Sequence, residues 1–304
     1  MLELIASVSF FIGAGYLLRR LGLARAEAAT DLNVLVFNVT LPALVFVALH
    51  RAELSWSMLL LPAIALVYSV LGTLGAWTTC RALALDRPVY GALIIACAFG
   101  NTTFLGYPVV QGFLGEAGLT LAVLYDLIGA TVATNTLAVL VAARFGTNHD
   151  ARAGDSLRRL LLYPPMWALA LGLGLHGTQI PAMIEHLAQH VGQATSPLIM
   201  CSIGLSLRAS TLRQNWRLVS LAVVLRLAVL PALMLAVLYA TGLRFDYVQV
   251  CVLQAAMPTM FYSLTLALVF GLDKAFAVNA IMASTVLSFA TLPLWYLILG
   301  LFAR

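Results

Sequence analysis

The sequence Cys97-Ala-Phe-Gly-Asn-Thr-Thr-Phe-Leu-Gly-Tyr-Pro108 interrupts an apolar segment that runs from about Tyr90 to Phe113. Its glycines and proline are poor helix residues, and its asparagine and threonines compete for backbone hydrogen bonds. In a bilayer such a break cannot face lipid, because each unpaired backbone group there costs several kcal/mol. A broken backbone at membrane depth is tolerated only where protein or a water-filled cavity covers it. We therefore interpret this stretch as a candidate binding site.

A second apolar segment, from about Tyr247 to Phe270, is interrupted by Gln254-Ala-Ala-Met-Pro-Thr-Met-Phe-Tyr-Ser263. Either break alone would be interpreted as an ordinary proline kink. Interrupted segments at corresponding places in the two halves of a chain are instead the best sequence indication of a transporter's substrate site. Their symmetric placement therefore favours a binding role.

The composition is that of a helical integral membrane protein. Of the 304 residues, 62% are hydrophobic and 10% are charged, whereas a soluble domain has about 25% charged residues. The net charge of +5 comes from arginines that lie mostly in short loops, so it does not predict nucleic-acid binding. No basic region precedes the first apolar segment, which we interpret as a transmembrane helix rather than a cleaved signal peptide.

Ten apolar segments approach the length of about 20 residues that a membrane span requires. They are 2–18, 32–49, 58–79, 90–113, 118–143, 160–177, 192–207, 217–241, 247–270 and 275–301. Arginine and lysine are concentrated in the loops after the odd-numbered segments. By the positive-inside rule those loops are cytoplasmic, which places both termini on the outer side of the membrane.

The longest polar interruption, 144–159, divides these segments into five plus five. Because five is odd, the two halves have opposite orientations. The predicted fold is an all-α integral membrane protein of ten transmembrane helices, arranged as two inverted five-helix repeats with helices 4 and 9 broken. The repeats are 1–146 and 160–304, and 147–159 is a cytoplasmic linker.

Candidate substrate ligands are polar or helix-breaking residues in the two breaks, together with an amide in the second helix. They are Asn101, Thr102, Thr103, Pro258, Thr259, Gln254, Tyr262 and Asn38. A broken helix exposes the N–H groups of the half-helix that follows, and its dipole favours an anion. An amide in the second helix should face other helices rather than lipid. The alternative is that these side chains cap the half-helices and bind no ligand.

Two ionisable residues fall inside apolar helices. Asp126, in the fifth, costs about 2.5–3.5 kcal/mol to insert as a charge, so it is a candidate proton-coupling site or a structural partner for Arg226 or an amide. Arg226, in the eighth, has three interpretations: a ligand for a carboxylate, a partner for Asp126, or a side chain that extends to the cytoplasmic surface. We favour the last.

Enzymatic chemistry is not indicated. The five histidines lack metal-ligand spacing, and the four cysteines form no CxxC pair. No Walker A motif or nucleophile–base pair is present either. We predict no catalytic residue, no metal and no cofactor.

Three stretches together resemble the auxin efflux carrier family, a group of ten-helix transporters in the BART superfamily that includes the plant PIN proteins and bacterial relatives. They are Asn33-Val-Leu-Val-Phe-Asn-Val-Thr-Leu-Pro42, Asn101-Thr-Thr-Phe-Leu-Gly-Tyr-Pro108, and the pair Ala256-Met-Pro-Thr259 and Thr291-Leu-Pro-Leu294. The resemblance covers essentially the whole chain and is closest to the bacterial-type members.

The resemblance implies a scaffold and a mobile transport domain with elevator-like motion, and broken helices that cross at the centre. It also implies an organic anion as substrate, with Asn101 contacting its carboxylate. Thr259 stands where plant members have an amide, so we expect a small carboxylate such as malate or malonate rather than auxin.

The predicted function is secondary active or facilitative transport, with efflux favoured, across the bacterial cytoplasmic membrane. Protons and sodium are both candidate coupling ions, and a homodimer is possible. Two alternatives remain: a sodium-coupled organic anion symporter of the bile-acid-transporter type, and a membrane sensor that does not transport.

Overall fold

A computed structural model describes residues 2–25, 27–81, 83, 85–148, 158, 160–206 and 215–302. All regular structure in these ranges is helical, apart from one isolated β-bridge. The prediction of an all-α protein is therefore confirmed. Most of the predicted linker, at 149–157 and 159, lies outside the described residues, as do Met1 and Arg304 at the termini.

The chain packs into two compact units, and each draws on separated parts of the sequence. Unit 1 contains Met1–Met58, Thr103–Val123 and Leu161–Arg208. Unit 2 contains Leu59–Thr102, Leu124–Leu160 and Ala209–Arg304. Each unit therefore takes helices from both halves of the chain.

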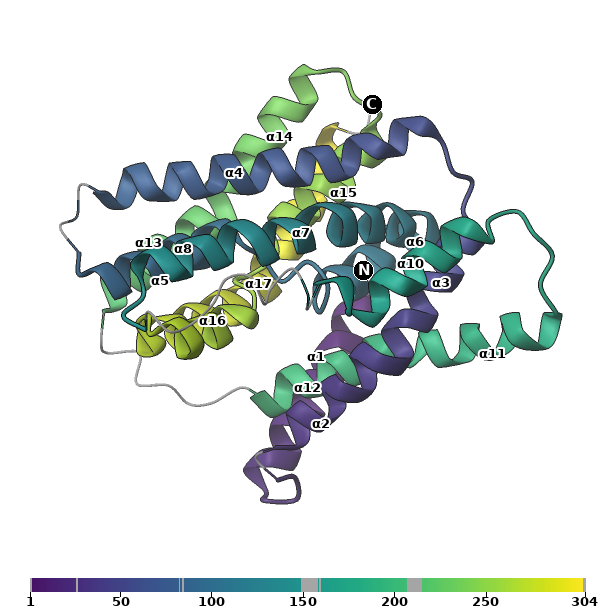
Figure 1. Cartoon of the computed structure of the whole chain (residues 1–304), viewed down its shortest axis with the longest axis horizontal. Coiled ribbons are helices and arrows are strands. Elements are labelled where there is room, and N and C mark those ends of the chain that lie inside the picture. Colours follow the sequence, from purple (N-terminus) through teal and green to yellow (C-terminus); the bar gives the residue numbers. More distant parts are fainter. Residues whose placement is uncertain are drawn as a thin grey trace. The chain divides into compact units, whose positions relative to one another are not determined.

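Unit 1 is built around a close packing of α1 and α12. Its helices are α1 (Leu2–Arg20), α2 (Ala28–Leu35), the π-helix η1 (Val36–Thr40), α3 (Leu41–His50), most of α6 (Gly106–Leu124), α10 (Pro164–Gly174), α11 (Ala182–Gln193) and α12 (Thr195–Ser206). Helix α12 packs against both α1 and α2 (Figure 1). A Cβ atom at Gly204 would lie 2.0 Å from the carbonyl oxygen of Ile12, so glycine permits this approach.

Around the predicted seventh segment, 192–207, the structure contains a helix that the sequence analysis did not predict. Helix α12 covers most of this segment, but it is preceded by helix α11, over residues assigned to a loop. The sequence of α11 is amphipathic, with Met183, Ile184 and Leu187 exposed. Its polar residues include Glu185, which forms an ion pair with Arg51 at the end of α3. Because polar residues alternate with apolar ones, average hydrophobicity alone hides this helix.

Unit 2 surrounds helix α5. Its helices are α4 (Leu60–Arg81), α5 (Arg87–Ala98), η3 (Tyr125–Ala130), α7 (Thr131–Ala133), η4 (Thr134–Ala138), α8 (Val139–Phe145), α13 (Trp216–Val224), η5 (Leu225–Val229), α14 (Leu230–Ala240), α15 (Phe245–Ala255), α16 (Tyr262–Phe270) and α17 (Lys274–Phe302). The short helix η2 (Trp56–Leu59) lies at the boundary, with Trp56, Ser57 and Met58 in unit 1. Helix α5 contacts α4, α8, α13 and α17, and every residue from Tyr90 to Ala98 is buried.

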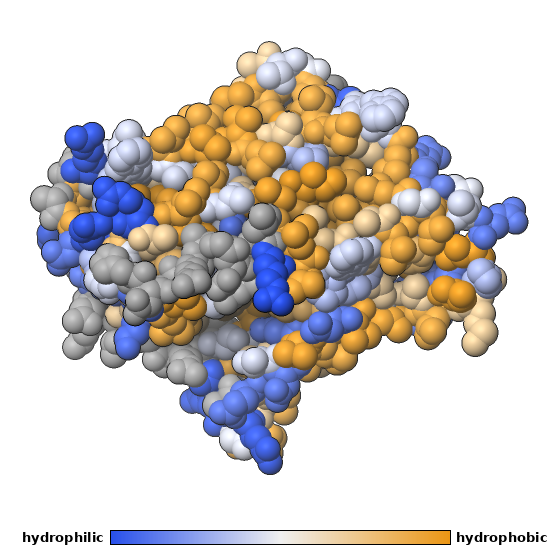
Figure 2. Space-filling model, in the orientation of Figure 1, coloured by the Kyte–Doolittle hydropathy of each residue, from blue (hydrophilic) through white to orange (hydrophobic). Residues whose placement is uncertain are grey.

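The surface is suited to lipid. Within the described part of the chain, five helical runs are long and apolar enough to cross a bilayer: Ala28–His50, Trp56–Thr79, Gly106–Phe145, Trp216–Ala240 and Lys274–Phe302. Figure 2 shows hydrophobic side chains over much of the visible face. Soluble proteins rarely expose continuous apolar area on this scale. The chain is thus a multi-pass membrane protein.

Candidate functional site: the crossing of two broken helices

Both interruptions predicted from the sequence are present, and in unit 2 the part of the first that ends at Thr102 lies beside the second. Helix α5 ends at Ala98, and the next residue, Phe99, is extended, with φ −114° and ψ 118°. Helix α15 ends at Ala255. The two strands of chain that follow pair as an antiparallel bridge between Gly100 and Thr259.

Two backbone hydrogen bonds hold the crossing together. The N–H of Asn101 donates to the carbonyl oxygen of Pro258 over 2.7 Å, and the N–H of Met260 donates to that of Phe99 over 3.2 Å. Buried backbone groups must be paired, and each break supplies the partners that the other lacks. The crossing therefore pairs backbone groups that the two breaks leave without helical partners.

The first break is linked to a buried carboxylate. The Thr102 hydroxyl donates to Oδ1 of Asp126 over 2.6 Å, and the Thr131 hydroxyl donates to the same oxygen over 3.4 Å. Asp126 is 1% exposed and lies in the π-helix η3, which packs against α4. The first break therefore contacts an ionisable group through one short hydrogen bond.

The second break is bonded to its own surroundings. The Thr259 hydroxyl donates to the carbonyl oxygen of Ala96 over 2.9 Å. The Thr259 N–H donates to the hydroxyl of Ser284 on α17 over 3.1 Å, and that hydroxyl donates to the carbonyl of Ile281. These contacts fix the break against α5 and α17.

Arg226 lies at the crossing, not at a surface. It is 1% exposed, so the favoured expectation that it extends to the cytoplasmic surface is wrong. Its Nε donates to the carbonyl oxygen of Met257 over 2.7 Å. Its Nη1 lies 3.3 Å from the carbonyl oxygen of Ala98, 3.4 Å from that of Cys97 and 3.1 Å from the hydroxyl of Tyr68.

The partners of Arg226 explain why a charge is tolerated there. Helix-terminal carbonyls have no intrahelical donor, and α5 and α15 both end beside the guanidinium. A second contact supports the arrangement, since the Tyr68 hydroxyl donates to the carbonyl oxygen of Ala255 over 3.2 Å. Arg226 and Tyr68 together therefore supply donors to both interrupted helices. Asp126 takes different partners, the threonine hydroxyls described above.

A local feature of the eighth predicted helix accompanies Arg226. Pro231 has no N–H, so the carbonyl of Leu227 receives no bond from the residue four positions on. The Trp295 indole donates to that carbonyl over 2.7 Å. The preceding turns, Leu225–Val229, form the π-helix η5, which contains Arg226. The arginine thus lies where the helix is locally widened and braced by α17.

The remaining predicted ligands differ in burial and in the unit to which they belong. Gln254 is completely buried in the last turn of α15, and Tyr262 is partly buried at the start of α16. Thr103 belongs to unit 1 and is partly buried. Asn38, also in unit 1, was expected to face other helices, but it is exposed and donates to the Val34 carbonyl of its own helix over 2.8 Å. That expectation is wrong.

Sequence reasoning did not predict three groups that surround the guanidinium of Arg226: Gly100, Tyr68 and the carbonyl of Met257. Gly100 allows the guanidinium to approach, and the other two bond to it. A signal was available, because an arginine inside an apolar helix needs acceptors and broken helices offer carbonyls. The described residues contain no cluster of three or more histidine, cysteine, aspartate or glutamate side chains suited to a metal.

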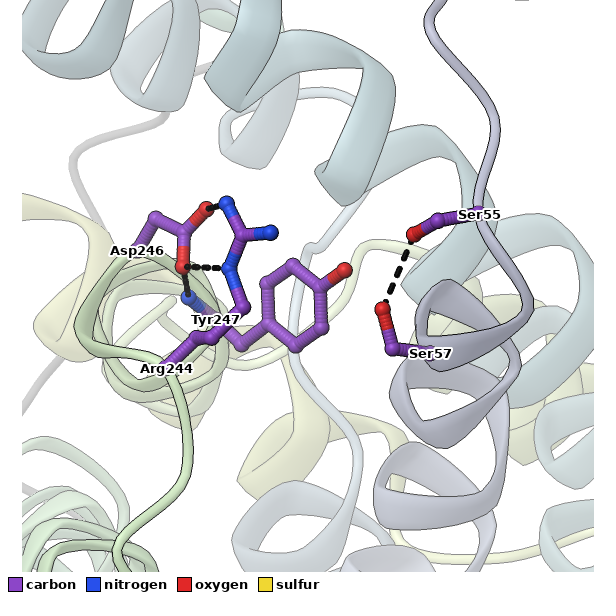
Figure 3. A network of polar contacts seen from close by, with 5 residues as sticks. All are labelled: Ser55, Ser57, Arg244, Asp246 and Tyr247. Carbon is purple, nitrogen blue, oxygen red and sulfur yellow. Dashed lines mark hydrogen bonds and ion pairs between the residues drawn. The ribbon is translucent and has the colours of Figure 1, made fainter.

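Exposed polar contacts of the chain are of the ordinary kind. In unit 2, Arg244 pairs with Asp246 over 2.8 Å, and Asp246 also accepts from the N–H of Tyr247 over 3.0 Å (Figure 3). In unit 1, the hydroxyls of Ser55 and Ser57 lie 2.8 Å apart (Figure 3). Arg244 thus has a carboxylate as partner, whereas Arg226 has neutral oxygens.

Comparison with known proteins identifies the family. The chain belongs to the membrane transport protein family, whose family model matches residues 1–296. The resemblance to auxin efflux carriers is thereby confirmed. The chain is 33% identical over 300 residues to an uncharacterized transporter of Methanothermobacter thermautotrophicus, covering 98% of both chains.

Two more distant relatives also match along most of their length. The uncharacterized transporter YfdV of Escherichia coli is 28% identical over 311 residues, with 95% of this chain and 97% of YfdV covered. A protein of Rhizobium meliloti named "Putative malonate transporter" is 26% identical over 298 residues, with 93% of this chain and 91% of the relative covered. The crossing described above therefore lies in a member of a family of membrane transport proteins.

Proposed function

We propose that this protein is a secondary active or facilitative carrier of a small carboxylate, working in the efflux direction. The observation that carries the proposal is the crossing itself. Two interrupted helices exchange backbone hydrogen bonds at Asn101 and Pro258, and transporters commonly bind substrate where such helices meet. Half-helices begin at Gly106 and Tyr262 in the chain, and their N-termini favour an anion.

A dicarboxylate such as malonate or malate is the substrate class we favour. A distant relative carries malonate in its name. Asn101 would donate its amide to the carboxylate, with Thr102, Thr103, Thr259, Pro258, Gln254, Tyr262 and Asn38 as further candidate ligands. Of these, Asn101 and Thr102 lead, because both belong to the first break and Thr102 also reaches Asp126.

Protons are the coupling ion that the contacts favour. Asp126 is buried and bonded to Thr102, so a change in its protonation would be felt directly at the first break. Sodium is disfavoured, because the buried guanidinium of Arg226 would repel a cation at the crossing. This argues against the symporter of the bile-acid-transporter type.

The mechanism we propose is elevator-like alternating access. Unit 2 holds the crossing and would be the moving part, and unit 1 would be the scaffold. The division of the chain into two compact units, each drawn from both halves, supports this. The proposal includes ten transmembrane helices in two inverted repeats, a bacterial cytoplasmic membrane, external termini and no enzymatic activity.

Uptake into proteoliposomes tests the proposal. Purified protein would be reconstituted, and entry of labelled malonate, malate and indole-acetate measured with and without a pH gradient. We expect saturable malonate or malate flux that a pH gradient accelerates. Saturable flux that ignores the gradient would remove Asp126 from coupling and leave facilitative transport. Binding without flux would favour the membrane sensor.

A further inference from the structure

We propose that Arg226 determines the charge preference of the crossing, by cancelling the negative ends of α5 and α15 so that an anion is accepted there. The inference rests on the proposed carboxylate transport and adds a residue to it. Sequence reasoning considered Arg226 as a direct ligand, as a partner of Asp126 or as a surface residue. The contacts of its guanidinium indicate a fourth role, in which Arg226 bonds to the helix ends and not to the substrate.

The first step is the charge of the helix ends. A helix carries about −0.5 elementary charge at its C-terminus and about +0.5 at its N-terminus. Both α5 and α15 end at the crossing, so their C-termini together place about −1 charge there. Without compensation, this field would oppose an anion and favour a cation.

The second step is the position of the compensating charge. The guanidinium bonds to the terminal carbonyls of both helices, Ala98 and Cys97 of α5 and Met257 just beyond α15. Its one positive charge equals the sum of the two terminal charges. What remains nearby is the positive N-terminus of the half-helix α16, which begins at Tyr262, together with the carboxyl group of Asp126, which adds negative charge only when it is ionised.

The third step is the closeness of Arg226 to the first break. A Cβ atom at Gly100 would lie 1.7 Å from Nη2 of Arg226, so the guanidinium rests directly against the backbone there. Asn101, the leading substrate ligand, is the next residue. At such short range within a buried site, the charge is screened much less than at a surface.

The fourth step is the kind of partner. Every hydrogen-bond acceptor described for Arg226 is neutral, namely three carbonyls and the Tyr68 hydroxyl. In an ion pair, one carboxylate would neutralise the charge, as Asp246 neutralises Arg244. The charge of Arg226 instead compensates the two helix ends.

The test compares malonate with malonamide, its neutral analogue of similar shape. Equilibrium binding of both compounds would be measured on protein in lipid nanodiscs, for the natural sequence, Arg226→Lys and Arg226→Gln. We expect the natural protein to prefer malonate at least tenfold. The Lys variant should keep this preference although it cannot contact all three carbonyls, and the Gln variant should lose it.

The Lys variant keeps the inference open to contradiction even where the Gln variant does not fold. Loss of preference in Arg226→Lys would show that the fork of donors matters and not the charge, and would overturn the inference. Preference retained in folded Arg226→Gln would overturn it as well. Either result leaves carboxylate transport standing. Failure of the natural protein to bind any carboxylate would instead overturn the proposed function together with the inference.

Discussion

The two breaks in the helices of unit 2 occupy comparable places, yet their contacts differ in kind. In the second break, Thr259 bonds to the Ala96 carbonyl and the Ser284 hydroxyl, and the Met257 carbonyl accepts a hydrogen bond from Arg226. The first break borders two buried ionisable groups, with Thr102 bonded to Asp126 and Gly100 in contact with Arg226. The difference indicates a division of work: both breaks hold Arg226, and the first one also contacts the carboxyl group of Asp126.

The largest effect is expected for Gly100→Ala. The added methyl would overlap the Arg226 guanidinium, which is enclosed and cannot withdraw without leaving helix-terminal carbonyls unpaired. Overpacking at such a site costs about 3 kcal/mol. We expect a clear fall in the thermal unfolding midpoint in detergent, together with loss of malonate binding.

Gly75→Ala is the matched control for this substitution. Gly75 lies within α4, and a Cβ atom there would meet nothing within 4 Å. Because alanine favours a helix by about 1 kcal/mol over glycine, the control should be neutral or stabilising. Equal unfolding midpoints for the two variants would contradict the described contact between Gly100 and Arg226.

Thr102→Val should have the next largest effect, and mainly on function. It removes the hydroxyl bonded to Asp126, a loss of about 1–3 kcal/mol that leaves a buried carboxylate less satisfied. We expect malonate flux to lose most of its response to a pH gradient, whereas Thr102→Ser should retain it. A full response in the valine variant would separate Asp126 from the first break.

Thr259→Val tests the corresponding side-chain hydrogen bond of the second break. The lost hydrogen bond runs to the neutral carbonyl of Ala96, so the expected cost is about 1 kcal/mol of stability. The response of malonate flux to a pH gradient should stay within twofold of the natural protein. A change in pH response as large as that of Thr102→Val would show that both breaks are coupled to Asp126.

The smallest effect concerns the exposed pair Arg51–Glu185 of unit 1. The hydrogen bond from Arg51 lowers the pKa of Glu185 below its ordinary value of 4.5. A lowered carboxyl pKa stabilises the fold above the ordinary pKa, and this contribution disappears as the pH falls through the folded value. Glu185→Gln should therefore leave the unfolding midpoint almost unchanged at pH 7 and slightly reduce its decline below pH 4.5. A large change at pH 7 would contradict the exposure of the pair.

Much of this arrangement could be predicted from residues that break helices. Both interruptions were indicated by Gly100, Asn101 and Pro258, because glycine, asparagine and proline disfavour a helix in any surroundings. The pairing of the two breaks followed from their symmetry and from the family resemblance. Helix α11 was missed, because its polar face lowers the average hydrophobicity that a search for spans uses.

The environment of Arg226 could not be predicted from its own helix. Its placement depends on where α5 and α15 end in space and on Gly100, more than a hundred residues away in the chain. A cation in an apolar segment has two solutions, to reach the surface or to find buried acceptors. The choice between them is made by tertiary contacts that local sequence does not record.

The most direct test of the central claim is malonate uptake by proteoliposomes that contain Asn101→Ala, compared with Asn135→Ala. Asn135 is another amide of unit 2, and its side chain bonds to the Thr131 carbonyl of the preceding turn. Both variants should reconstitute as folded protein. If the crossing binds the carboxylate, flux should fall at least tenfold in Asn101→Ala and remain near the natural level in Asn135→Ala. Equal flux in the two variants would contradict a substrate site at the first break.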